Sequence, residues 1–111
     1  TGRSKGAMLT HGNLGSNAKV LQKYWGWKKG DVLLHALPIF HVHGLFVASH
    51  GALLNGSKMI WLPRLDTKQL IKHMPRSTVM MGVPTFYVRL LLDKEYAFIY
   101  FWISTIINRN I

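Results

Sequence analysis

The fold class is clearest in the stretch Val32-Leu33-Leu34-His35-Ala36-Leu37-Pro38-Ile39-Phe40-His41-Val42-His43-Gly44. Val32 to Ala36 form a short, largely apolar run that stops before Pro38, which is typical of a buried strand leading into a loop. From His43 to Leu54 apolar residues follow without the alternation of a strand, so we predict a buried helix there. Asn55-Gly56-Ser57 supplies the turn that ends it.

The segments on either side continue this alternation. We predict three further strands, at Gly6–Leu9, Lys58–Leu62 and Thr78–Val83. We predict three further helices, namely His11–Tyr24 between an N-cap at Thr10 and a stop at Gly26, Thr67–Met74 capped by Asp66 or Thr67, and Thr85–Leu92 opened by Pro84. The spacing predicts an α/β fold in which βαβ units build a partial parallel sheet covered by helices on both faces.

In sheets of this kind, ligands bind in the loops beyond the carboxyl ends of the strands. We therefore expect any site in four places: near Thr10, at Leu37–His43, at Pro63–Asp66 and at Gly82–Phe86.

Composition limits both the fold and the chemistry. A chain of 111 residues suits one domain or a piece of a larger one, and 49% hydrophobic residues suffice for a packed core. The absence of cysteine excludes disulfides, thiolate metal sites and cysteine nucleophiles. The apolar stretch Tyr96–Ile107 has about twelve positions, fewer than the roughly 20 that a spanning helix needs, so we expect no transmembrane segment.

The chain is strongly basic, with 14 Lys and Arg residues against 4 acidic ones and a formal net charge of +10. Such a balance favours an anionic partner, whether nucleic acid, a membrane surface or a phosphorylated ligand. The cations are spread along the chain with no run longer than two, which argues against a dedicated nucleic-acid face. A basic module that binds nucleic acid or membranes is the alternative to an enzyme, and salt-sensitive binding to DNA or anionic vesicles would identify it.

The first six residues, Thr1-Gly2-Arg3-Ser4-Lys5-Gly6, combine small residues with two cations. Glycine lets backbone N–H groups approach a phosphate, Thr and Ser hydroxyls donate to its oxygens, and Lys adds a point charge. The mix suits a phosphate-binding loop, although a flexible terminus has the same composition. The Walker pattern G-x-x-x-x-G-K-[ST] does not occur.

The loop after the central strand carries two histidines. Pro38 stiffens this loop, and Gly44 permits close packing where the next helix begins. His41 and His43 could bind a metal together, but no third ligand is near in sequence and zinc sites need three or four protein ligands. Ordinary hydrogen-bonded histidines, or a histidine at a substrate site, are the alternatives.

Gly82-Val83-Pro84-Thr85 follows a strand and opens a helix, a place suited to an anion or a polar ligand. One turn further along, Arg89 offers a guanidinium that can hold a carboxylate through two parallel hydrogen bonds. The alternative for Arg89 is a solvated surface residue.

Together these motifs resemble the adenylate-forming acyl-CoA synthetases. Thr1–Leu14 is similar to the end of that family's signature loop, T-S-G-T-T-G-x-P-K-G, with Ser4 in place of the usual proline. Leu37–Gly44 resembles the family's next core motif, and Gly82–Thr85 its substrate-wall segment. The stretches His35–Ala48 and Met81–Tyr87 are most similar to malonate–CoA ligases. The resemblance covers about Thr1–Asp93, which implies part of the large N-terminal domain of such an enzyme.

The resemblance implies a two-step reaction, in which a carboxylate attacks the α-phosphorus of Mg-ATP and coenzyme A then displaces AMP from the acyl adenylate. It implies that Thr1–Gly6 enclose the β- and γ-phosphates, that His41 is the catalytic residue beside the reacting carboxylate, and that Val42 and Gly82–Thr85 line the acyl pocket. The implied substrates are malonate or a related short carboxylate, ATP with Mg²⁺, and coenzyme A, without nucleic acid. A synthetase for a monocarboxylate is the nearest alternative.

The role of Arg89 is inferred from its charge and not from a family motif. A dicarboxylate has one carboxylate that does not react, and burying it unpaired costs several kcal/mol. We hypothesise that Arg89 pairs with it in the acyl pocket, with Arg64 as the competing candidate.

The resemblance stops near Leu92–Lys94 and divides the chain into a family segment, 1–93, and an apolar tail, 94–111. We expect the tail not to belong to the fold; a genuine divergent segment is the alternative. Because the chain opens in mid-motif, we expect a fragment that does not catalyse adenylation alone. The family leads us to expect a mitochondrial or cytoplasmic protein.

Overall fold

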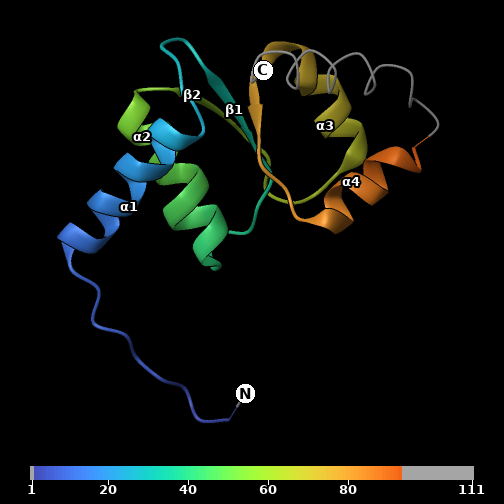
Figure 1. The fold of residues 1–111 in the computed structure, drawn as a ribbon. Coiled ribbons are helices and arrows are strands. Elements are labelled where there is room, and N and C mark those ends of the chain that lie inside the picture. Colours follow the sequence, from blue (N-terminus) through green and yellow to red (C-terminus); the bar gives the residue numbers. More distant parts are fainter. Residues whose placement is uncertain (1, 94–111) are drawn as a thin grey trace.

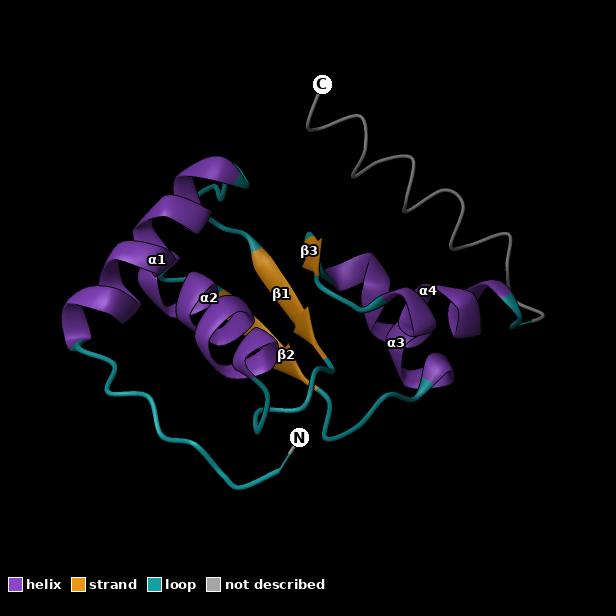
Figure 2. Cartoon of the chain, turned by 60° about the horizontal axis from the view of Figure 1, so that its bottom comes forward, coloured by secondary structure: helices purple, strands orange, loops and turns teal. Residues whose placement is uncertain are grey.

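The computed structural model describes residues 2–93 and shows a sheet between two layers of helices (Figures 1 and 2). The three strands are β1 (Val32–His35), β2 (Lys58–Trp61) and β3 (Val79–Met80). They are parallel and lie in the order β2-β1-β3. The predicted α/β class and parallel sheet are therefore confirmed; the predicted tail 94–111 lies outside the described residues.

The central strand β1 forms the middle of the core. Its pairing with β2 runs from Val32 opposite Lys58 to His35 opposite Trp61. Leu33 and Leu34 are both fully buried, although neighbouring side chains on a strand point to opposite faces. Burial on both sides requires helices over both faces, as predicted for a parallel sheet.

Helix α1 (His11–Tyr24) has the predicted bounds and caps. Thr10 accepts a hydrogen bond from the Asn13 backbone, and the Asn13 side chain accepts one from the Thr10 backbone, so a capping box opens the helix. At the other end Gly26 has φ +65°, and the N–H of Trp27 donates to the carbonyl of Gln22. This left-handed glycine and its paired hydrogen bonds form a Schellman motif.

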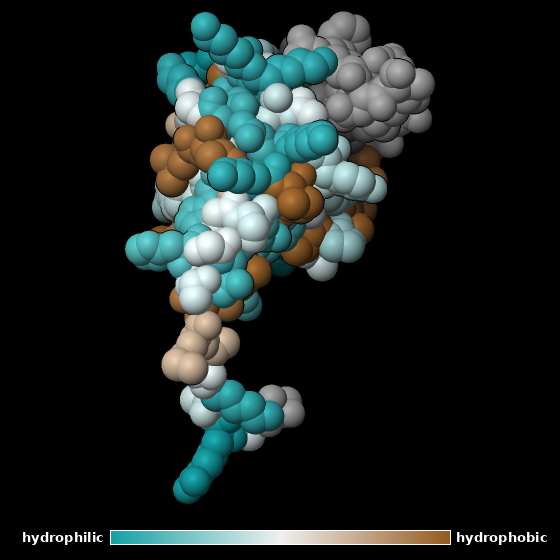
Figure 3. All heavy atoms as spheres, turned by 60° about the vertical axis from the view of Figure 1, so that its left-hand side comes forward, coloured by the Kyte–Doolittle hydropathy of each residue, from teal (hydrophilic) through white to brown (hydrophobic). Residues whose placement is uncertain are grey.

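The strand predicted at Gly6–Leu9 does not form. These residues are exposed, with Met8 at 99% exposure, and adopt no strand structure. Figure 3 shows the N-terminal segment as a narrow projection from the body of the molecule. A strand is stabilised by hydrogen bonds to a neighbouring strand, and among the described residues no strand lies beside this segment. The local sequence alone was therefore insufficient to predict this strand.

The helix predicted at 43–54 consists of two parts. The π-helix η1 (His43–Ser49) runs directly into α2 (His50–Asn55), which ends at Gly56 with φ +65°. Small residues form the buried stripe of this segment: Gly44, Ala48, Ser49, Gly51 and Ala52. The predicted buried helix is confirmed, with a wider first turn than expected.

On the opposite face lie α3 (Thr67–His73), the short 3₁₀-helix η2 (Met74–Arg76) and α4 (Pro84–Leu91). Asp66 caps α3 by accepting a hydrogen bond from the backbone of Gln69, which selects between the two predicted caps. β3 is shorter than predicted. Within residues 2–93 no helix is long and apolar enough to cross a membrane.

Candidate active site

Three predicted site loops meet at one edge of the sheet. Because the strands are parallel, the loops after β1, β2 and β3 (residues 36–42, 62–66 and 81–83) all leave from the carboxyl edge. The start of α1 and the segment before it lie on the same side of the molecule (Figures 1 and 2). Residues 2–10, which include Gly2–Gly6 of the predicted phosphate loop, are exposed there; Thr1 lies outside the described residues.

The loop from Pro38 to Gly44 is closed on itself. The Pro38 carbonyl accepts the N–H of His41 at 3.3 Å, and the His41 carbonyl accepts the N–H of Leu45 at 3.1 Å. A Cβ on Gly44 would collide with the Pro38 carbonyl, with the carbonyl carbon at 2.9 Å. The predicted close packing at Gly44 is thus confirmed, because only glycine leaves room for the Pro38 backbone.

This loop presents His41 and Val42 to solvent. Both side chains are exposed, and the His41 ring lies 4.7 Å from the Phe40 ring between centroids. His43 begins η1 and is half-buried. Among residues 2–93 no group of three or more His, Asp or Glu side chains is placed to hold a metal ion.

Beneath the loop lies a buried polar cluster that the sequence analysis missed. His35 Nε2 lies 2.9 Å from the Gly44 carbonyl and 3.0 Å from Ser49 Oγ, and Ser49 Oγ donates to the same carbonyl at 2.8 Å. Burial lowers the pKa of His35, because the charged imidazolium would lose hydration; the Gly44 carbonyl opposes this and nearby His43 adds to it. The signal for this cluster was a single histidine inside an apolar strand.

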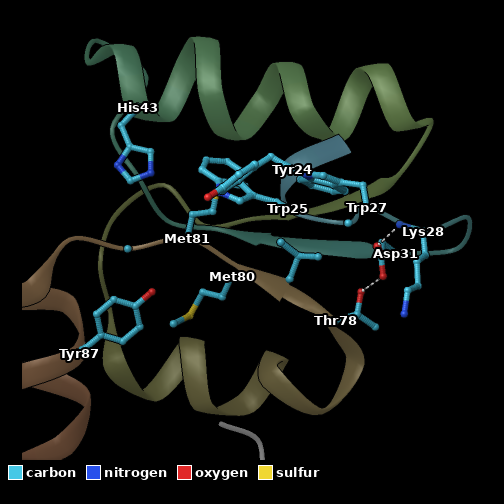
Figure 4. A pocket seen from close by; sticks show the side chains of 13 residues that line it. Tyr24, Trp25, Trp27, Lys28, Asp31, His43, Thr78, Met80, Met81 and Tyr87 are labelled. Carbon is cyan, nitrogen blue, oxygen red and sulfur yellow. Dashed lines mark hydrogen bonds between the residues drawn. The ribbon is translucent and has the colours of Figure 1, made fainter. Parts of the chain in front are cut away.

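A groove of about 720 Å³ runs along β3 (Figure 4). Its far wall is the C-terminal end of α1 and the turn after it. The aromatic and apolar side chains that line it are Tyr24, Trp25, Trp27, Val79, Met80, Met81 and Tyr87. It extends from Lys28, Asp31 and Thr78, at the amino end of the strands, to His43, Gly82 and Tyr87 at the carboxyl end.

The segment Gly82–Thr85 adjoins this groove at Gly82. A Cβ on Gly82 would approach the Phe86 side chain to 3.1 Å, so Gly82 packs closely against the start of α4. Val83, Pro84 and Thr85 are exposed. Burial raises the pKa of Tyr87, against a lowering contribution from the backbone of Gly82.

Arg89 is exposed and does not line the groove. Phe86 and Leu90 are the buried residues of α4. At 3.6 residues per turn, Tyr87 and Arg89 lie on opposite sides of this buried stripe, roughly 160° apart. The structure therefore brings His43, Gly82 and Tyr87 to one groove. The other predicted residues of the loops and of α4 lie outside its walls, namely His41, Val42, Val83, Pro84, Thr85 and Arg89.

The sequence matches the AMP-binding enzyme family over residues 1–101. It is 42% identical to the mitochondrial malonate–CoA ligase ACSF3 of Mus musculus over 103 residues, which cover 86% of this chain and 18% of the relative. Over 101 residues it is 36% identical to a long-chain-fatty-acid–CoA ligase of Bacillus subtilis, covering 86% of this chain and 18% of the relative.

Solved structures agree with these relatives. ATP-bound MatB from Rhodopseudomonas palustris superimposes with a TM-score of 0.81 and 56% sequence identity, covering 85% of this chain and 19% of MatB. A malonyl-CoA ligase with methylmalonyl-CoA and AMP bound matches with a TM-score of 0.73 and 36% identity, covering 78% of this chain and 19% of that one. The chain thus spans about a fifth of the length of these proteins. The matching sequence, topology and loop arrangement show that this chain belongs to the AMP-binding enzyme family.

Proposed function

We propose that this chain is a segment of an ATP-dependent acid–thiol ligase that converts malonate, or a related short carboxylate, to its coenzyme A thioester. The observation that carries the proposal is the Pro38–Gly44 loop, packed closely at the carboxyl edge of the sheet, in a chain that is 56% identical to ATP-bound MatB over the 85% of its length that aligns. The ligands named for the related structures are ATP, methylmalonyl-CoA and AMP. Each is anionic, which suits a segment with a formal net charge of +10.

In the first step a carboxylate oxygen of the substrate attacks the α-phosphorus of ATP. The new C(O)O–P bond replaces the bond to the β-phosphate oxygen, and pyrophosphate leaves. Thr1–Gly6 would surround the β- and γ-phosphates with backbone N–H groups, hydroxyls and the Lys5 ammonium, so that charge on the leaving group is stabilised. His41 would orient the attacking carboxylate.

In the second step the thiol of coenzyme A loses its proton to solvent and its sulfur attacks the carbonyl carbon of the acyl adenylate. The acyl C–O bond breaks, and AMP leaves with the bonding electrons. Val42 and Gly82–Thr85 would line the acyl group. Mg²⁺ is expected with the nucleotide, where it would neutralise charge on the phosphates; among residues 2–93 no cluster of metal-ligating side chains is placed to hold it.

The test is AMP formation by the full-length protein that contains this segment, with malonate, methylmalonate, acetate and butyrate as substrates. We expect turnover with the dicarboxylates and at least a tenfold loss in His41→Ala. Faster turnover with the monocarboxylates would support the alternative, a synthetase for a monocarboxylate. The similarity to a long-chain-fatty-acid–CoA ligase is the reason for including these substrates. The isolated 111-residue chain is expected to form no AMP.

Arg89 carries the proposed recognition of the second carboxylate. Arg64 in the β2–α3 loop is the competitor, and Arg76, before β3 at the opposite edge of the sheet, is the matched control. We expect Arg89→Ala to reduce kcat/KM for malonate far more than for butyrate, and Arg76→Ala to change neither. An equal loss for both substrates in Arg89→Ala would remove Arg89 from this role.

The relatives named mitochondrial lead us to expect a mitochondrial or cytoplasmic location for the full-length protein. Localisation of a tagged full-length protein tests this expectation.

A further inference from the structure

The proposed reaction does not use the buried cluster of His35, Ser49 and the Gly44 carbonyl. His35 is 1% exposed and Ser49 is 6% exposed. The cluster joins the end of β1 to η1, at Gly44 near its start and at Ser49, its last residue; the Pro38–Gly44 loop connects β1 to η1.

The contacts determine which nitrogen of His35 carries the proton. A carbonyl oxygen only accepts, so the 2.9 Å contact with Gly44 requires a hydrogen on Nε2. Ser49 Oγ already donates its hydrogen to the Gly44 carbonyl and therefore cannot donate to the ring. The other nitrogen, Nδ1, is buried and has no hydrogen-bond partner among the described residues. A proton on Nδ1 would be a buried donor without an acceptor, which disfavours both the other tautomer and the imidazolium.

The His35 ring and backbone also contact β2 and the residue after it. The ring stacks on the Trp61 ring at 4.3 Å between centroids and 28° between planes. The backbone carbonyl of His35 accepts the N–H of Leu62 at 2.8 Å. The Nε2–H donor is thus held by β2 as well as by β1, and it does not depend on the loop for its position.

Gly44 is held from two directions. Its carbonyl accepts hydrogen bonds from His35 and Ser49, while its Cα lies against the Pro38 carbonyl. Ser49 follows Gly44 by five residues, which is the spacing of hydrogen bonds in a π-helix, and such turns are frequent at functional sites. Both ends of the loop that carries His41 are therefore fixed relative to the sheet.

We infer that His35 is a positioning residue: its neutral Nε2–H donates to the Gly44 carbonyl, together with Ser49, and so holds the loop that places His41 beside the substrate carboxylate. The inference rests on the proposed function for the role of His41. The hydrogen bonds and the tautomer stand independently of it.

The test uses three variants of the full-length ligase. His35→Gln places an amide N–H near the position of Nε2 and keeps the donor to Gly44. His35→Phe keeps a ring for Trp61 and removes the donor, and Ser49→Ala removes the second donor. Displacements on the order of 1 Å at a catalytic group cost about 10²-fold in rate, so we expect kcat to fall by about 10- to 100-fold in His35→Phe. We expect it to stay within about threefold in His35→Gln, with KM for ATP little changed in both.

A second readout does not require activity. Long-range ¹H–¹⁵N spectra of the full-length protein with labelled histidine report the tautomer of His35 and the ring signals of His41. We expect the Nε2–H form of His35, and shifted His41 signals in His35→Phe but not in His35→Gln. An Nδ1–H tautomer, or equal loss of kcat in the Gln and Phe variants at equal folded fraction, would overturn the inference. Absence of carboxylate-dependent AMP formation in the wild type, with these spectra as expected, would instead contradict the proposed function.

Discussion

Gly44→Ala tests the geometry of the site loop most directly. The added Cβ would lie 2.9 Å from the Pro38 carbonyl carbon and closer still to its oxygen, with Leu37 Cβ at 3.3 Å. The obstacle is backbone, which cannot rotate away as a side chain can. We estimate that the loop must retreat by on the order of 1 Å, which lowers kcat by about 10²-fold and costs about 1–3 kcal/mol of stability through overpacking.

Gly15→Ala is the matched control. Gly15 lies within α1, and a Cβ there would meet no atom within 4 Å. Alanine is favoured over glycine inside a helix by about 0.5–1 kcal/mol, so this variant should be slightly more stable and equally active. Both variants are measured in the full-length ligase, by urea unfolding and by AMP formation. If Gly44→Ala matched the wild type in kcat, the packing of Pro38 on Gly44 would not hold His41 in place.

His35, Thr10 and Leu34 each allow a separate test of stability. The pKa of His35 is lowered below the model-compound value of 6.5, so the unfolded state binds the proton first; the stability from its neutral ring is complete above about pH 6.5 and is lost as the pH falls through the lowered pKa. His35→Gln should therefore flatten the pH dependence of the urea midpoint as the pH falls below about 6.5, and an unchanged slope would contradict this. Thr10→Ala removes the capping box of α1 and should cost about 0.5–2 kcal/mol, whereas retention of full stability would show that the cap contributes nothing. Leu34→Ala empties a fully buried position in β1 and should cost about 2–5 kcal/mol by denaturant unfolding; a cost below about 1 kcal/mol would mean that the core closes over the gap.

Elements controlled by neighbouring residues were predictable from the sequence. The bounds of α1 matched because Thr10, Asn13 and Gly26 act within a few residues of one another, through a capping box and a left-handed stop. The requirement for glycine at position 44 was also predictable, because this residue lies a few positions after Pro38, where the next helix begins.

Contacts between distant residues were not predictable in this way. His35 and Ser49 are separated by 14 positions, and the stacking of His35 on Trp61 depends on the β1–β2 register. The sequence presented His35 as one histidine in an apolar run, whose partners are specified only when the strand and the π-helix pack together. Tyr87 reached the groove for the same reason, since the buried face of α4 determines which side of the helix it occupies.

The strand predicted at Gly6–Leu9, which does not form, shows the difference between what the local sequence determines and what tertiary contacts decide. The sequence by itself carried the family motifs and determined the alternation of strands and helices and the caps of α1, because alternation and caps depend on local hydrogen bonds and on the spacing of apolar residues. It left the cap of α3 open between Asp66 and Thr67, which the structure decided. Only the tertiary structure decided the order β2-β1-β3, the donor from His35 to Gly44 and the groove beside β3. A strand or a buried donor is stable only with a partner across space, and the chain must fold before that partner is defined.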